Sequence, residues 1–128
     1  MSTLARIQAR SERVDELTAA NFGPGESLWE PRCFDLAYEL TDGDRLLAVC
    51  TLQWAPEQQY WILGDVCVSA HGHGYGTEIV RRVCEENPEP IWAETSNPAA
   101  MRILEKNGFT RTDECPWESD MTFYIKRR

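Results

Sequence analysis

The sequence lacks any apolar run long enough to cross a membrane as a helix. Its start, Met1 to Leu17, carries charged residues every few positions and has no apolar core of the kind found in secretory signal peptides. These two absences argue against a helical membrane protein and against a secretory leader. The cytoplasm is therefore the expected location, with no membrane partner.

Closely spaced cysteine pairs are also missing. The count of five is odd and contains no C-x-x-C motif, so neither a disulfide framework nor a zinc site is expected. The histidines, His71 and His73, have no third ligand at a suitable spacing, so no metal site is expected. Most of the cysteines have apolar neighbours and are expected to be reduced core residues: Cys33, Cys50, Cys67, Cys84 and Cys115.

Positive charge is scarce, because 13 Lys and Arg residues stand against 21 Asp and Glu residues, a net charge of −8. An acidic chain repels a phosphate backbone, so nucleic acid is disfavoured as a partner. The same charge attracts a cationic partner or substrate. A length of 128 residues with 42% hydrophobic residues fits one globular domain, 1–128, with a core of its own.

Hydrophobic periodicity and turn residues predict a mixture of strands and helices. Strands are predicted at Ala5–Arg10, Cys33–Leu40, Arg45–Trp54, Tyr60–Val68, Ile91–Thr95, Phe109–Cys115 and Met121–Lys126. Helices are predicted at Ser11–Ala20, at Thr77–Glu86 and, capped by Ser96 or Asn97, at Pro98–Lys106. The order strand, helix, strand after residue 60 implies one right-handed crossover between parallel strands. The expected fold class is therefore α+β, with a mixed, mostly antiparallel sheet and flanking helices.

Two smaller features refine this expectation. Thr41 to Asp44 and Ala55 to Gln59 are predicted to be the turns of an antiparallel meander. Gly64 interrupts an otherwise apolar strand, which indicates a bulge or a close approach of another group to the backbone.

The stretch from His71 to Gly76, His-Gly-His-Gly-Tyr-Gly, joins a predicted strand to a predicted helix. Glycines permit positive φ and a close approach to the backbone, and the first N–H groups of a helix attract anions, above all phosphate. The spacing G-x-G-x-G fits neither the P-loop nor the dinucleotide fingerprint. The alternatives are a phosphate cradle of another kind and a plain flexible turn.

Two blocks of this sequence resemble the GCN5-related N-acetyltransferase (GNAT) superfamily. The first is the stretch from His71 to Gly76, which is similar to the family pattern Arg/Gln-x-x-Gly-x-Gly/Ala. The second runs from Asn97 to Phe109 and is similar to the family's Asn-x-x-Ala followed, after a spacer, by Lys-x-Gly-Phe. The resemblance covers roughly 33–126 and implies a GNAT-like domain with a shortened N-terminal region.

The resemblance implies acetyl-CoA as the ligand. The backbone of the glycine stretch would hold the pyrophosphate, Asn97 would bond to the pantetheine arm, and a strand edge would pair with that arm. The physics of a diphosphate and of an amide-rich arm agrees with such an arrangement. The implied cofactor-binding residues are Val66, Cys67, Val68, His71, Gly72, His73, Gly74, Tyr75, Gly76, Thr77 and Asn97.

The sequence departs from the family pattern at two positions. His71 stands where the family often has Arg or Gln, which puts one side-chain contact to phosphate in question. Leu104 stands where many members have a tyrosine that protonates the departing thiolate. A thiol with a pKa near 8.5 is a tolerable leaving group, so the loss of this acid need not abolish turnover.

The resemblance implies acyl transfer from acetyl-CoA to an amine, which must first lose a proton. Asp65 and Glu94 lie near the ends of the two strands that would flank the ligand, and they are the candidate bases. Each has a structural alternative, as a hydrogen-bonded buried group or a surface ion-pair partner. His73 is a further candidate base, and Tyr124 is a candidate substitute acid.

The expected function is an N-acetyltransferase that acts on a small-molecule amine or on a protein lysine or N-terminus. The rival from another class is a non-catalytic acyl-CoA-binding module for sensing or interaction, and a general binder of phosphate ligands is a third. The net negative charge favours a cationic acceptor. The resemblance implies a possible homodimer, because members of the family often dimerise. Trp29, Trp54 and Trp117 are candidate walls of the acceptor pocket.

Overall fold

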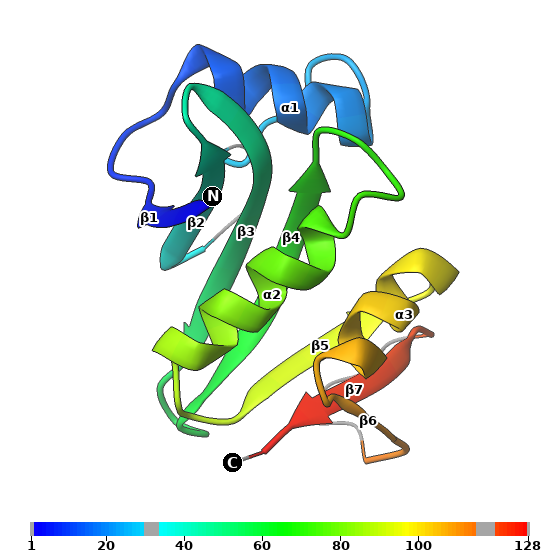
Figure 1. Cartoon of the computed structure of the whole chain (residues 1–128). Helices are drawn as coiled ribbons and strands as arrows, with labels where there is room; N and C mark the ends of the chain where they lie inside the picture. Colours follow the sequence, from blue (N-terminus) through cyan, green and yellow to red (C-terminus); the bar gives the residue numbers. More distant parts are fainter. Residues whose placement is uncertain (1, 30–33, 115–119, 128) are drawn as a thin grey trace.

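The computed structural model describes residues 2–29, 34–114 and 120–127. Its elements alternate along the chain as shown in Figure 1. They are β1 (Thr3–Arg6), α1 (Glu12–Phe22), β2 (Leu36–Asp42), β3 (Arg45–Ala55), β4 (Tyr60–Val68), α2 (Tyr75–Glu86), β5 (Ile91–Thr95), α3 (Pro98–Lys106), β6 (Thr110–Thr112) and β7 (Thr122–Lys126).

The strands form one seven-stranded sheet in the order β1-β2-β3-β4-β5-β7-β6. All neighbouring strands are antiparallel except β4 and β5, which are parallel and are joined through α2. The expected α+β fold with one parallel crossover is therefore confirmed. Within the described residues, no helix is long and apolar enough to span a bilayer.

The helix ends follow local sequence signals. The Ser11 hydroxyl accepts a hydrogen bond from Val14 N, so Ser11 caps α1 as predicted. Asn97, rather than Ser96, caps α3, because its Oδ1 accepts from Ala99 N at 2.8 Å. Helix α2 begins at Tyr75, two residues before the predicted start, and Gly74 occupies its N-cap.

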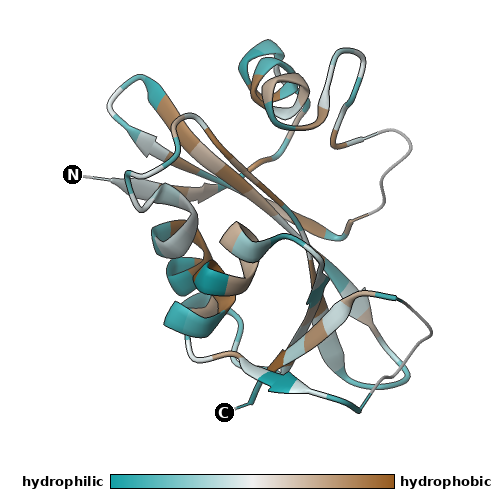
Figure 2. Ribbon diagram, turned by 90° about the vertical axis from the view of Figure 1, so that its right-hand side faces the viewer, coloured by the Kyte–Doolittle hydropathy of each residue, from teal (hydrophilic) through white to brown (hydrophobic). Residues whose placement is uncertain are grey.

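The two faces of the sheet carry different hydrophobic clusters. Helices α2 and α3 cover the larger cluster, to which Ile79, Val83 and Leu104 contribute. Helix α1 covers the smaller one on the opposite face, with Val14 and Leu17 packed near Val49 and Cys67. Figure 2 shows hydrophobic residues concentrated in the strands and hydrophilic residues on the outer face of α2, as expected from a helix with one apolar stripe.

The predicted bounds fail at several strand ends. The sequence predicts the first strand at Ala5–Arg10, but it is Thr3–Arg6, because its pairing with β2 ends at Tyr38 and Ile7 N makes the last bond, to Ala37 O. The sequence predicts a turn at Thr41 and Asp42, but these residues belong to β2, where a register shift lets them pair with β3. Cys33 and Cys115, predicted strand ends, lie outside the described residues.

Strand β6 is also shorter than the predicted Phe109–Cys115 strand. It begins at Thr110, because Phe109 is buried in the core and its N–H still bonds to Leu104 O at the end of α3. Strand β7 begins at Thr122, one residue after the predicted start at Met121.

Strand β4 contains the bulge that Gly64 predicted. Cys50 pairs with Val66 and Leu52 pairs with Leu63, so Gly64 and Asp65 together oppose the single residue Thr51. Asp65 N donates to Thr51 Oγ1 at 2.8 Å, and a Cβ built on Gly64 would lie close against the same oxygen. Only glycine therefore fits at position 64.

Gly64→Ala is expected to destabilise the fold by about 1–3 kcal/mol, the usual cost of overpacking a closed site. The added methyl group must displace Thr51 Oγ1 and with it the bond to Asp65 N. Urea unfolding measures the effect, and Gly43→Ala, at a turn glycine with open space around it, is the comparison. A stable Gly64→Ala protein with an unchanged urea midpoint would contradict this account of the bulge.

Candidate functional site

The glycine stretch forms a backbone cradle at the start of α2. Gly72 and Gly74 have φ values of +81° and +76°, the left-handed conformation that L side chains rarely adopt. Gly74 is the N-cap of α2 and makes no side-chain cap bond, so the first turn of the helix depends on other partners for its N–H groups. The free N–H groups of this first turn and the positive end of the helix dipole together favour the binding of an anion at the start of α2.

A cavity of about 300 Å³ lies over this cradle and extends to α3. Three of its residues carry basic side chains: His71 from the loop, and Arg102 and Lys106 from α3. Arg102 and Lys106 are four positions apart and so lie on one face of the helix. The remaining lining residues are Val68, Ala70, Gly72, Gly74, Tyr75, Gly76, Thr77, Ala99 and Ile103.

Three members of the glycine stretch are engaged in packing. The His73 ring stacks on the Tyr75 ring with centroids 5.3 Å apart, and the Tyr75 hydroxyl accepts a bond from Arg45 Nη2 at 3.3 Å. Gly76 packs so closely against α3 that a Cβ there would lie 2.7 Å from Ile103 Cδ1. His73 does not line the cavity, whereas His71 does.

A second cavity of about 240 Å³ lies between β4 and β5. These strands pair only at Trp61 with Ile91 and Ile62 with Trp92, and beyond those pairs they diverge, as Figure 1 shows. The two cavities share Ile103 as a lining residue. The second is lined by Phe22, Leu63, Gly64, Asp65, Val66, Val80, Ala93, Glu94, Thr95, Asn97, Ala100, Ile103 and Leu104.

Both candidate bases line this second cavity, one from each strand. Asp65 lies two residues before Cys67, which belongs to the cluster under α1, so it faces the α1 side of the sheet. Glu94 follows Ala93, which faces the α2 and α3 core, so Glu94 faces the α1 side too. The structure therefore brings the two carboxylates to one face of the cleft. Asp65 and Glu94 are both half-buried.

Other predicted site residues lie away from the cavities. Cys67 is fully buried beneath α1. Tyr124 pairs with Ala93 across β5 and β7, is 3% exposed and lies in the main core with Leu104. Neither residue lines the cleft, although Leu104 does.

Two of the tryptophans predicted to wall an acceptor pocket, Trp29 and Trp54, do not line the cleft. Trp54 packs on Trp61 with centroids 4.8 Å apart, beside the turn between β3 and β4. Trp29 packs on Phe34 and lies against the α1-side cluster. Trp117 lies outside the described residues.

Sequence reasoning missed four residues that the fold brings to the site. Phe22 lines the cleft, Arg102 and Lys106 line the cavity over the cradle, and Asn21 hydrogen-bonds to the backbone of Val68. The four-residue spacing of Arg102 and Lys106 is a sequence signal, because it places both cations on one face of a helix. Asn21 and Phe22 have no such signal, because their position depends on how α1 crosses β4.

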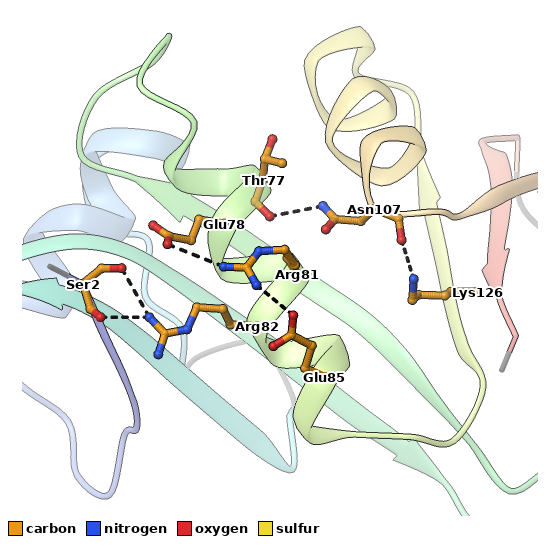
Figure 3. A network of polar contacts seen from close by, with 8 residues as sticks. All are labelled: Ser2, Thr77, Glu78, Arg81, Arg82, Glu85, Asn107 and Lys126. Atoms are coloured by element: carbon orange, nitrogen blue, oxygen red, sulfur yellow. Dashed lines mark hydrogen bonds and ion pairs between the residues drawn. The ribbon is translucent and has the colours of Figure 1, made fainter.

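A larger cavity of about 470 Å³ lies at the far ends of α2 and α3. Three of its four cations are engaged: Arg81 pairs with Glu85 at 2.7 Å and Lys126 donates to Asn107 O (Figure 3), and Arg127 lies 3.8 Å from Glu114. The fourth, Lys106, also lines the cavity over the cradle. Helix C-termini attract cations, so this charge has a structural explanation. Burial raises the pKa of the Cys84 thiol there to about 11, which keeps it neutral and unreactive at pH 7.

Across the described part of the chain, no three His, Cys, Asp or Glu side chains are grouped so as to hold a metal ion.

The sequence matches no protein-family model. It has no significant match among curated protein sequences. Solved structures, in contrast, match along almost the whole chain.

An acetyltransferase from Bacillus subtilis in complex with CoA has a TM-score of 0.79 and 16% identity, covering 100% of this chain and 99% of that one. A GNAT family acetyltransferase from Elizabethkingia anophelis with acetyl-CoA bound has a TM-score of 0.77 and 14% identity, covering 99% and 98%. A GNAT family acetyltransferase from Bacillus cereus has a TM-score of 0.71 and 13% identity, covering 100% and 98%. The chain therefore has the GNAT acetyltransferase fold.

Proposed function

We propose that this protein is an acetyl-CoA-dependent N-acetyltransferase that acts on an amine. The observation that carries the proposal is the adjacency of two cavities. The cavity over the backbone cradle and the cleft between the diverging strands, which holds two carboxylates, share Ile103 as a lining residue. Similar folds with CoA or acetyl-CoA bound support the same ligand here.

The cradle fits a pyrophosphate in both shape and charge. The N–H groups from Gly72 to Thr77 supply donors at the positive end of the α2 dipole. Arg102 and Lys106 supply side-chain charge around the same cavity, and His71 lines it as well. Arg102 and Lys106 would replace the side-chain contact to phosphate that Arg or Gln makes in the family and that is in question with His71. These two cations make the cradle locally basic in a chain that is acidic as a whole.

The cleft fits the amide-rich arm. Because β5 diverges from β4, the edge of β4 beside Gly64, Asp65 and Val66 lines the cleft instead of pairing with a strand. An extended ligand with amide groups can pair with such an edge like an added strand. Asn97 lies across the same cleft, with its Oδ1 occupied in capping α3.

The carboxylates have a defined task in this proposal. An amine with a pKa of about 10.4 is mostly protonated at pH 7, and making it neutral costs roughly 4–5 kcal/mol. Asp65 or Glu94, on the α1 side of the cleft, would accept that proton directly or through water. The acyl donor would supply a thioester, and its thiolate would leave without a proton from Leu104, which carries no acid. The acidic chain favours a cationic acceptor, and a cytoplasmic location remains part of the proposal.

A non-catalytic acyl-CoA-binding module is the second candidate function. The observation that favours it is Leu104, which lines the cleft as a 3% exposed apolar residue where the resemblance implies a tyrosine. Tyr124, the substitute acid, lies in the core and does not line that cleft. Acceptor-dependent release of free CoA separates the two functions.

Calorimetric titration tests the proposal without knowledge of the acceptor. We expect acetyl-CoA to bind with a dissociation constant in the micromolar range and ATP to bind much more weakly, because the cleft beyond the cradle is shaped for the pantetheine arm. A panel of primary amines, assayed for free CoA, then follows. Absence of acetyl-CoA binding to the folded protein would overturn both candidate functions.

A further inference from the structure

The edge of β4 that faces the cleft is not uniformly open. Ser69 N donates to Leu47 O at 2.9 Å, and the register then places Val49 opposite Cys67. Antiparallel pairs alternate between bonded and non-bonded, so Val66 and Val68 direct their N–H and C=O groups away from β3. These groups therefore face the side of β4 on which β5 lies, at a point where β5 has already diverged from β4.

Asn21, near the end of α1, occupies both of these groups on Val68. Its Oδ1 accepts from Val68 N at 3.3 Å, and its Nδ2 donates to Val68 O at 3.1 Å. The side-chain amide thus pairs with Val68 as a neighbouring strand would. Nδ2 also donates to Leu17 O at 2.9 Å, which fixes the side chain to its own helix.

Val66 is in a different position. Among the residues that the structure describes, no side chain bonds to its outward N–H or C=O, and Val66 lines the cleft. The open edge is therefore available at Val66 and closed at Val68. These two positions are two residues apart, which is about 7 Å along a strand.

We infer that Asn21 is a positioning residue that sets the register in which the acyl-CoA arm pairs with β4. This inference rests on the proposed function. An arm that comes from the cradle meets Val68 first and then Val66, because β4 runs from the cleft toward the glycine stretch. With Val68 closed, the arm pairs at Val66, which brings the thioester to the bulge at Gly64 and Asp65. With Val68 open, a shift of about 7 Å toward the loop would draw the thioester away from both carboxylates.

Amide hydrogen exchange, followed by NMR on the whole chain, reads this register directly. In the free protein, we expect the Val68 amide to exchange slowly and the Val66 amide to exchange quickly. Acetyl-CoA should slow exchange at Val66 and leave Val68 unchanged. In Asn21→Ala, we expect Val68 to exchange at least tenfold faster in the free protein and to become protected when acetyl-CoA is added.

Asn21→Leu is the matched control, because leucine has a similar size but can make neither bond. We expect Val68 to exchange quickly in this variant and to stay unprotected by acetyl-CoA, since the side chain still blocks the edge. The amide of Thr18, a fully buried residue in the middle of α1, reports whether the helix remains folded. With a detectable acceptor, Asn21→Ala should lower kcat more than it raises KM.

Two results would overturn the inference. The first would contradict the role of Asn21 alone, and the second would contradict the proposed function as well. If acetyl-CoA protects Val66 in every variant and never Val68, Asn21 only fastens α1 to the sheet. If acetyl-CoA protects neither the amides from Gly72 to Thr77 nor Val66 in the unmodified protein, the proposed function itself fails, and the inference fails with it.

Discussion

Gly74→Glu is expected to raise the dissociation constant for acetyl-CoA by at least about 100-fold, which corresponds to roughly 2.7 kcal/mol. Gly74 is the N-cap of α2 and lines the cavity over the cradle. A carboxylate there would compete with the phosphate for the free N–H groups and would repel it. Calorimetric titration of the variant and the unmodified protein measures the loss.

Backbone strain is the competing explanation, because Gly74 has a φ of +76° and a side chain in the left-handed region costs about 1–2 kcal/mol. Gly43→Glu is the matched control. Gly43 also has positive φ, +59°, with open space around it, and it lines neither cavity of the site. We expect Gly43→Glu to lose stability without losing affinity. Equal loss of affinity in both variants would show that charge in the cradle is not the cause.

Gly74→Asn separates the two effects further. Asparagine tolerates the left-handed conformation better than other residues with a Cβ and carries no charge. We expect this variant to bind acetyl-CoA far more tightly than Gly74→Glu does. Similar affinities for the two variants would assign the loss to the missing glycine.

The central strand, the cradle and the crossover could be predicted from the sequence because each depends on local signals. Tyr60–Val68 and Ile91–Thr95 are apolar runs bounded by turn residues, and their predicted bounds are confirmed. Gly64 predicted the bulge because only a special backbone explains glycine inside a strand. Asn97 and Ser11 predicted helix starts through their short polar side chains.

The parts that sequence reasoning missed depend on pairing between distant elements. The end of β1 is set by where β2 stops accepting its bonds, and nothing near Arg6 encodes that point. Asn21 reads locally as a residue that ends a helix, and its bonds to Val68 exist only because α1 crosses β4. The sequence predicts a helix over Arg102 and Lys106 but not their place at the cradle, because the cradle comes from the His71–Gly76 stretch, which precedes α2 and β5 in the chain.

Removal of both cleft carboxylates, in the double variant Asp65→Asn/Glu94→Gln, is expected to lower kcat/KM for an amine acceptor by about 10²–10⁴. Both residues line the same cleft on one face of the sheet, so one of them can take over partly when only the other is lost. The two single variants identify the main base, since the variant with the larger loss of rate has lost the carboxylate that accepts most of the protons. The rate of acceptor-dependent CoA release is the measurement.

Acetyl-CoA affinity is the internal control, because the carboxylates lie in the cleft and the phosphate cradle lies beyond Ile103. We expect the dissociation constant to change less than about threefold, which is below 0.7 kcal/mol. Without the base, turnover depends on the fraction of acceptor that is already neutral, so the rate should rise about tenfold per pH unit up to the pKa of the amine. An unchanged rate and pH profile in the double variant would mean that the amine loses its proton elsewhere, and that the two carboxylates are structural.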